Sequence, residues 1–146
     1  AEDGIRDVER SRGLGDVYKR QVIISPSNPF LSIAPILAIP EFQHQLTNCG
    51  APRIADSPMM GAKAFKGPTA KIMRELGYEM SSFTVASYYS PNLIDGIIID
   101  TTDSDLAPRI EKLGIQTYVT DTLMNSFSEK KRLAAEVIQF AESFQK

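Results

Sequence analysis

A polar turn near the start of this sequence has the residues needed to bind an anion. The β-branched run Val22–Ile24 predicts a short, fully buried strand, and the turn follows it directly. Ser27 or Asn28 can cap a helix there, with a proline in the first turn, where a missing N–H group is not needed. The unpaired N–H groups and the dipole of such a helix favour a phosphate. The residues expected to bind it are Ser25, Ser27, Asn28, Pro29 and Ser32.

The same turn also has a purely structural interpretation. Ser27 and Asn28 would then only cap the helix, and Ser25 would only close the strand. Against this, open α/β sheets bind their ligands beyond the carboxyl ends of the strands, which is where the turn would lie. The residues alone leave both interpretations open.

A second candidate site lies in the loop that begins at Pro58, where two cations stand among small residues. Lys63 and Lys66 are surrounded by glycines and an alanine, which let a ligand approach the backbone. Two lysines at the carboxyl end of a strand suit a phosphate, a carboxylate or a dinucleotide leaving group. The alternative is a pair of solvated lysines, since lysine is mostly a surface residue. The residues expected to bind a ligand here are Lys63, Lys66 and Gly67.

The elements that would position these two sites alternate between strands and helices. Apolar and β-branched runs predict strands at 22–24 and 52–57, within 93–100 at the run GIIID, and at 116–120. Helical spacing and capping residues predict helices at 30–39, 41–48, 69–76, within 78–92, at 103–113 and at 126–144. The last of these helices has Leu133, Val137, Phe140 and Phe144 along one apolar stripe. This alternation predicts an α/β fold, a partial Rossmann-like, doubly wound parallel sheet with flanking helices.

Acidic and aromatic residues in the second half of the sequence have structural interpretations. Asp100 and Asp121 fall at strand ends, where they could bind a metal ion, but turn capping is the preferred role for both. A residue in 103–105 is expected to cap the helix that follows. Tyr88 and Tyr89 could stack on a flat ring, although packing of their helix against the sheet is preferred.

Composition and charge exclude several classes of protein. A length of 146 residues with 42% hydrophobic residues suits one ordinary soluble domain, and a net charge of −2 argues against a nucleic-acid partner. The single cysteine, Cys49, cannot form an internal disulfide, and no apolar run is long enough to cross a bilayer. We therefore expect a cytoplasmic protein with no membrane partner.

Four blocks of the sequence point to a family. They are SPSNPFLSIAPILAIP, SPMMGAKAFKGPTAKIMRELG, DGIIID and YVTDTLM, in that order from Val22 almost to the end. Together they resemble the C-terminal half of the 2-phospho-L-lactate transferases of coenzyme F-420 biosynthesis. The resemblance implies transfer of a phospholactyl or phosphoenolpyruvyl group from a guanosine-diphosphate-linked lactate or enolpyruvate to the deazaflavin Fo, with release of GMP. It also implies Mg²⁺ as cofactor, and a homodimer is compatible with it.

The resemblance further implies that the catalytic residues lie outside this sequence. Proteins of the family begin with a glycine-rich nucleotide loop and carry metal-binding aspartates in their first half, and neither pattern occurs here. The chain alone is therefore expected to be inactive. One alternative is a non-catalytic nucleotide-sugar binding regulator of the same superfamily, which typically has a GPGS-type turn in place of SPSNP. Another is a response-regulator receiver, but its acidic cluster is missing near Val22–Ile24.

Residues 1–21 differ sharply from the rest, being charged and without a sustained apolar period. Asp16 to Gln21 can be encoded by nucleotides that resemble the transposon end used to build sequencing libraries. We therefore interpret 1–21 as a sequencing-adapter artefact or a disordered lead-in. Residues 22–146 are interpreted as the C-terminal part of a Rossmann-like transferase domain.

Overall fold

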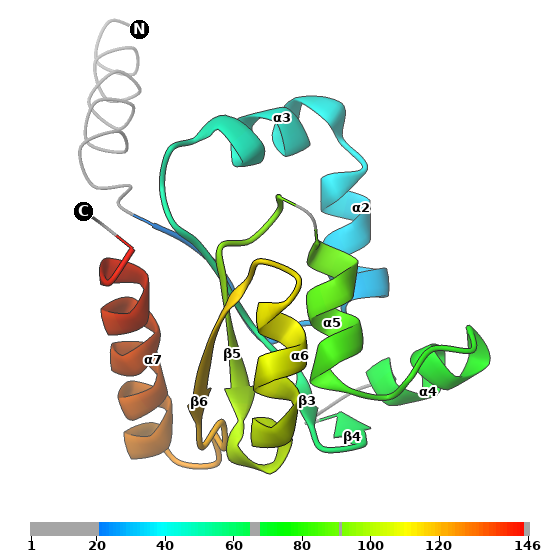
Figure 1. The fold of residues 1–146 in the computed structure, drawn as a ribbon, viewed down its shortest axis with the longest axis vertical. Helices are drawn as coiled ribbons and strands as arrows, with labels where there is room; N and C mark the ends of the chain where they lie inside the picture. Colours follow the sequence, from blue (N-terminus) through cyan, green and yellow to red (C-terminus); the bar gives the residue numbers. More distant parts are fainter. Residues whose placement is uncertain (1–20, 65–67, 91, 145–146) are drawn as a thin grey trace, which may run out of the picture.

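A parallel sheet of four strands forms the centre of the structure. The computed structural model describes residues 21–64, 68–90 and 92–144. Residues 1–20 lie outside these ranges, so the interpretation of 1–21 as an artefact or a lead-in stays a prediction. The strands stand in the order β1-β2-β5-β6. Their bounds are Val22–Ile24, Arg53–Asp56, Gly96–Asp100 and Gln116–Thr120. With helices on both faces, the sheet confirms the predicted α/β Rossmann-like class (Figure 1).

Helices and one small hairpin connect these strands. The α-helices are α2 (Ala34–Leu37), α3 (Pro40–Asn48), α4 (Thr69–Glu75), α5 (Ser82–Tyr89), α6 (Ala107–Glu111) and α7 (Phe127–Glu142). A π-helical turn, η1 (Pro29–Ile33), precedes α2, and a 3-10 helix, η2 (Thr101–Leu106), precedes α6. The hairpin consists of β3 (Met59–Met60) and β4 (Lys63–Ala64). Of the helices in the described ranges, none has the length and hydropathy of a membrane span.

Side chains alternate along the strands, so each face of the sheet has its own apolar core. On one face, Ile97 and Ile99 of β5 pack with residues of α5 and α6. On the other face, Ile54 and Ile98 pack with α7, which stands to the left of β5 and β6 in Figure 1, opposite α5 and α6. The residues that α7 contributes include Leu133, Val137 and Phe140, which confirms the apolar stripe expected for the last helix.

The first helix differs from the continuous segment predicted at 30–39. Its first turn is π-helical, because the N–H of Ala34 bonds to the carbonyl of Pro29, and regular α-helix extends only over Ala34–Leu37. Pro35 explains part of this irregularity, since it cannot donate the hydrogen bond that an α-helix needs at that position. Pro40 then opens α3 as a separate helix. Both prolines are thus tolerated at helix starts.

The helix after β5 begins earlier than predicted. Asp100, and not a residue in 103–105, is its cap: Oδ1 accepts hydrogen bonds from the Thr102 N–H at 2.9 Å and hydroxyl at 2.7 Å. The helix therefore starts as the 3-10 segment η2. Asp103 lies inside that segment and is buried. The sequence offers several possible caps in this segment, and the helix is capped by Asp100 because it begins directly after the last residue of β5.

Gly96 allows α7 to approach β5 closely. A Cβ atom added at position 96 would lie 2.7 Å from Cε1 of Phe140 and 2.9 Å from Cζ of Phe144. These distances are shorter than ordinary van der Waals contact, so any larger residue must displace an aromatic ring from the core. The glycine is therefore required by packing on this face of the sheet.

We expect Gly96→Ala to destabilise the protein by about 1 to 3 kcal/mol through overpacking. Urea denaturation measures the loss, with Gln139→Ala on the exposed face of α7 as the matched control. Because the clash is with a ring, Gly96→Ala in a Phe140→Leu background should cost less than it does in the wild type. Equal costs in the two backgrounds would show that the ring contact is not the cause.

Candidate functional site

The parallel arrangement brings the polar strand ends to one edge of the sheet. Ile24 of β1 is the register partner of Ala55 in β2, so the next residues, Ser25 and Asp56, follow side by side at that edge. Asp100 of β5 is likewise paired with Thr120 of β6. The turn predicted to bind phosphate therefore adjoins the ends of the other strands, as in open α/β sheets that bind ligands.

Asn28 is the cap of the turn. Its Oδ1 accepts hydrogen bonds from the backbone N–H groups of Phe30 at 2.9 Å and Leu31 at 3.0 Å. Its backbone carbonyl accepts a further bond from the N–H of Ser32 at 3.0 Å. The N–H groups of the first turn, which the sequence analysis assigned to a phosphate, are thus already bonded to Asn28. Of the two predicted caps, Asn28 and not Ser27 takes this role.

The turn nevertheless keeps some hydrogen-bonding groups for a ligand. Nδ2 of Asn28 is buried and has no partner among the described residues. Ser25 and Ser32 are exposed, and Ser27 is partly buried. Pro29 is buried and occupies the first helical position, where it fixes the backbone and lacks only an unneeded N–H. An amide N–H₂ and three hydroxyls therefore remain as potential donors.

The predicted lysine loop is in part a hairpin. Lys63 lies in β4, where it pairs with Met60, and its side chain is exposed. The sequence analysis expected a loop of small residues here, whereas the structure has an antiparallel hairpin with two residues in each strand. Gly61, between the two strands, has the positive φ of 59° that the turn requires. Lys66 and Gly67 lie outside the described residues. The hairpin contacts η2 and β5, and so belongs to the same edge of the sheet.

A buried chain of hydroxyls and one carboxylate joins the hairpin to η2. The Ser57 and Ser82 hydroxyls are 2.9 Å apart, and Ser82 donates to Oδ2 of Asp103 at 2.6 Å. The N–H of Met59 donates to the Ser57 hydroxyl at 3.2 Å. Burial raises the pKa of Asp103 above its ordinary range, against the lowering effect of the hydrogen bond from Ser82. These hydrogen bonds connect the start of the hairpin to α5 and η2, and so they fix the position of the hairpin.

Asp100 and Asp121 cap turns, as the sequence analysis preferred. Oδ2 of Asp100 accepts bonds from the N–H and hydroxyl of Thr122, each at 3.0 Å, in addition to the two from Thr102. Burial alone would raise the pKa of Asp100, but these hydrogen bonds hold it below its ordinary value. Oδ1 of Asp121 accepts from the N–H of Leu123 at 2.9 Å. Tyr89 is buried in the core, so packing is also its role.

Asp56 is a site residue that the sequence analysis missed. It is the last residue of β2, it is only 4% exposed, and its Oδ1 has no hydrogen-bond partner among the described residues. Burial raises its pKa to about 7. The sequence did contain one signal for it. Side chains two positions apart in a strand point to the same face, so Asp56 shares the face of the apolar and buried Ile54.

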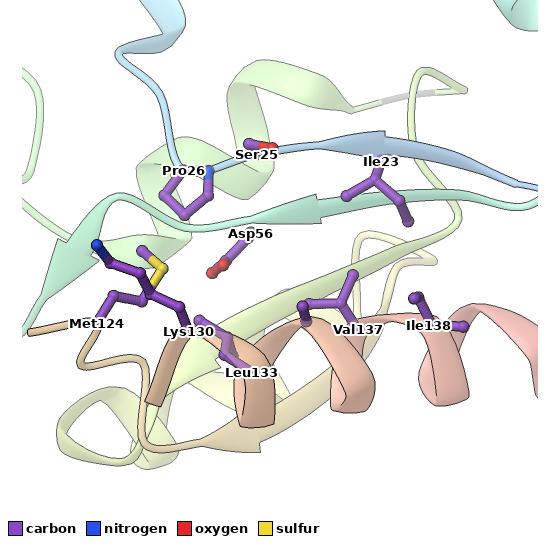
Figure 2. Close-up of a pocket in the computed structure, with 10 residues that line it drawn as sticks. Ile23, Ser25, Pro26, Asp56, Met124, Lys130, Leu133, Val137 and Ile138 are labelled. Atoms are coloured by element: carbon purple, nitrogen blue, oxygen red, sulfur yellow. The ribbon is translucent and has the colours of Figure 1, made fainter. Parts of the chain in front are cut away.

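The Asp56 side chain faces a groove between the sheet and α7, called here the β1–α7 groove. Figure 2 shows the carboxylate between the strands and the helix, pointing toward α7. The volume of the groove is about 270 Å³. Apolar side chains form most of its walls, and Ser25, Pro26 and Lys130 are its other members. The residues that line it are Ile23, Ser25, Pro26, Asp56, Met124, Lys130, Leu133, Ala134, Val137 and Ile138.

The carboxylates of this edge do not form a metal site. Across the three described ranges, no group of three or more His, Cys, Asp or Glu side chains is placed to hold a metal ion. The oxygens of Asp100 are occupied by four hydrogen bonds, and those of Asp103 face Ser82. What the edge offers is a buried carboxylate beside a polar turn, which suits an organic ligand with N–H and phosphate groups.

Comparison with known proteins relates this chain to one family. The family model described as 2-phospho-L-lactate transferase CofD matches residues 18–140. The 2-phospho-L-lactate transferase of Methanothermobacter thermautotrophicus is 37% identical over 141 residues, covering 92% of this chain and 45% of that protein. That of Methanosarcina barkeri is 38% identical over 117 residues, covering 80% and 37%. The phosphoenolpyruvate transferase of Streptomyces coelicolor is 30% identical over 121 residues, covering 83% and 38%. The chain thus spans less than half the length of these relatives.

The buried Asp56 makes the stability of the fold depend on pH. Its pKa of about 7 in the folded state exceeds the ordinary value of 3.8, so the folded protein holds a proton there that the unfolded chain releases. The contribution of Asp56 to the free energy of unfolding should therefore be highest below the ordinary value, fall as the pH rises toward 7, and then level off. Lys130 is the one other ionisable residue among those lining the groove.

Asp56→Asn should remove this dependence, because the amide does not titrate. We expect the variant to gain stability over the wild type as the pH rises from about 4 to about 7, by a few kcal/mol in all. Urea unfolding at several pH values measures the difference, with the exposed Asp105→Asn as control. Parallel curves for wild type and Asp56→Asn would contradict a raised pKa.

Proposed function

Because this chain belongs to the 2-phospho-L-lactate transferase family CofD, we propose that residues 22–146 are the C-terminal part of a cytoplasmic transferase of coenzyme F-420 biosynthesis. In this proposal the enzyme moves a phospholactyl or phosphoenolpyruvyl group from a guanosine-diphosphate-linked lactate or enolpyruvate to the deazaflavin Fo. The observation that carries the proposal is the family match over residues 18–140. The names of the relatives, one set for each phospho-acid, support the two alternatives for the donor.

The reaction is a displacement at phosphorus. The side-chain hydroxyl of Fo attacks the phosphorus that bears the lactyl or enolpyruvyl group, and a new P–O bond forms. The bond from that phosphorus to the bridging oxygen of the diphosphate breaks, and GMP leaves with the oxygen, while the hydroxyl proton is released. Such a step needs little covalent help from a protein, but it needs fixed donors that hold the diphosphate in line.

The polar turn and the lysine hairpin supply such donors in this proposal. Nδ2 of Asn28 is a buried donor without a partner among the described residues. Ser25, Ser27 and Ser32, which precede and follow Asn28 in the sequence, provide three hydroxyls. Pro29 keeps the turn fixed. Lys63, with Lys66 and Gly67 beside it in sequence, adds positive charge from the hairpin side of the same edge.

The proposal assigns Mg²⁺ to a part of the full-length enzyme outside this chain. The described carboxylates do not fit the ion, since Asp100 is occupied by hydrogen bonds and Asp56 has no second acid beside it in its groove. The ion would neutralise phosphate oxygens. The residues of this chain have a different part, which is to bind and orient the nucleotide diphosphate.

GMP release from the GDP-linked donor tests the function directly. The full-length protein that contains this sequence should release GMP when it is given the donor, Fo and Mg²⁺, whereas the 146-residue chain alone should release none above background. Chromatography of the nucleotide products provides the measurement. A full-length protein that binds the donor but never releases GMP would favour a non-catalytic member of the superfamily.

Two variants of Asn28 separate ligand binding from capping in the full-length protein. Asn28→Asp keeps an oxygen that can cap the turn but replaces the Nδ2 donor with an acceptor, so GDP affinity should fall about tenfold or more while stability changes little. Asn28→Ala loses the cap as well and should also cost about 1 kcal/mol of stability. Calorimetric titration and thermal unfolding measure the two effects. Wild-type GDP affinity in Asn28→Asp would leave the turn with its capping role alone.

A further inference from the structure

The β3–β4 hairpin is too small to determine its own position at the carboxyl edge of the sheet, beside the lower end of α5 in Figure 1. Each of its strands has two residues, and an isolated two-stranded hairpin is marginally stable at best. Its position must therefore come from the residues that anchor it to the rest of the fold. One anchor is apolar, because Met59 is completely buried in the core on the α5 and α6 face of the sheet.

The register of the hairpin decides which side chains point away from that core. Met60 of β3 is paired with Lys63 of β4, so the two share one face of the hairpin. Successive residues of a strand alternate between faces, and Met59 occupies the buried one. Lys63 is accordingly exposed. The hairpin thus presents the ammonium of Lys63 at the edge to which the proposed function assigns the diphosphate.

The second anchor is polar, and it ends at Asp103. The Ser57 hydroxyl accepts the N–H of Met59 at 3.2 Å and lies 2.9 Å from the hydroxyl of Ser82. Ser82 in turn donates to Oδ2 of Asp103 at 2.6 Å. Burial raises the pKa of Asp103, while hydrogen bonds from Ser82 and from the backbone of Gly61 act against that rise. Asp103 is therefore connected to the residues at both ends of β3.

Stability alone does not explain an acid at position 103. Asp103 does not cap its own helix, because Asp100 has that role. Burying a carboxylate is unfavourable, and buried ionic groups can often be replaced by apolar ones without loss of stability. Hydrogen bonds, however, restrict both distance and angle, whereas the flexible side chain of Met59 can adapt to a shifted hairpin. What the polar anchor adds to the apolar one is a precise position for the hairpin.

We propose that Asp103 is a positioning residue of the phosphate-binding edge, which acts through Ser82 and Ser57 to hold the hairpin where Lys63 faces the bound diphosphate. The inference rests on the proposed function, which supplies the diphosphate. Asp103 itself does not touch the ligand in this assignment, since its carboxylate faces Ser82 inside the protein and its negative charge would repel a phosphate. Its removal should therefore weaken binding only as far as Lys63 contributes to it.

A double-mutant cycle in the full-length protein tests this dependence, with GDP as the probe in calorimetric titrations. Lys63→Met should weaken GDP binding about fivefold through loss of the charge, and Asp103→Leu should weaken it by a similar factor. The variant that carries both changes should bind no more weakly than Lys63→Met alone, because Asp103 acts only through the lysine. Asp103→Asn keeps one oxygen that can accept from Ser82, so it should recover most of the affinity.

Two further variants separate positioning from stability and from charge. Ser57→Ala breaks the same polar anchor without altering an acid, so it should repeat the loss of affinity even if Asp103→Leu does not fold. Asp105→Leu removes an exposed acid from the same segment, η2, and should not weaken GDP binding. Thermal unfolding of every variant shows that the titrations are made on folded protein. A purely structural role of Asp103 would lower the melting temperature and leave the affinity of the folded protein unchanged.

Several results would overturn the assignment. They are a full-length protein that binds no GDP, wild-type affinity in Lys63→Met, wild-type affinity in Ser57→Ala or in a folded Asp103→Leu, and losses that simply add in the double variant. Because affinity is measured without turnover, these results differ from a failure of the proposed function. A protein that shows the coupling but releases no GMP supports positioning by Asp103 and refutes the transferase, and one that releases GMP without the coupling does the reverse.

Discussion

The burial of β5 on both of its faces is the constraint on which the rest of the structure depends. All five of its residues are buried, with Ile97 and Ile99 in one core and Ile98 in the other. The strand begins at Gly96, where α7 needs space, and ends at Asp100, whose four hydrogen bonds tie η2 to the segment after β6. Both helical layers and both neighbouring strands are thus positioned by one short apolar segment.

The acids at the two edges of the sheet show how burial separates structure from function. At the amino edge, Asp95 accepts hydrogen bonds from the backbone N–H and the guanidinium of Arg53 at 2.8 to 3.0 Å. Burial would raise the pKa of Asp95, but these bonds with Arg53 lower it. At the carboxyl edge, Asp56 has burial without such bonds, and its pKa rises. The paired acid thus holds two strands together, whereas Asp56 Oδ1 has no partner among the residues that the structure describes.

The sequence was most informative where one local pattern decides the structure. The apolar run of β5, the stripe of α7 and the capping turn at Asn28 each follow from spacing and residue type, and each is found as predicted. The features that were missed depend on contacts distant in sequence. Asp56 is exceptional only because α7 covers it, and the hairpin that carries Lys63 is positioned by Ser57, Ser82 and Asp103 from three separate segments. Strand parity places Asp56 on the same face of β2 as Ile54, but no local pattern shows that α7 covers it or that these three segments position the hairpin.

The register of the sheet also has a consequence for the order of folding. Gly96 pairs with Gln116, whereas Ile54 pairs with Gly96 across about twice that sequence separation. Each doubling of a closed loop costs about 0.6 kcal/mol of chain entropy, so the β5–α6–β6 unit closes most cheaply and is the natural nucleus. β1 and β2, which carry the polar turn and Asp56, would then join a unit already formed. Substitutions in the polar turn or at Asp56 should accordingly act on the unfolding rate and leave the folding rate nearly unchanged, so these positions can vary without slowing the folding of the chain.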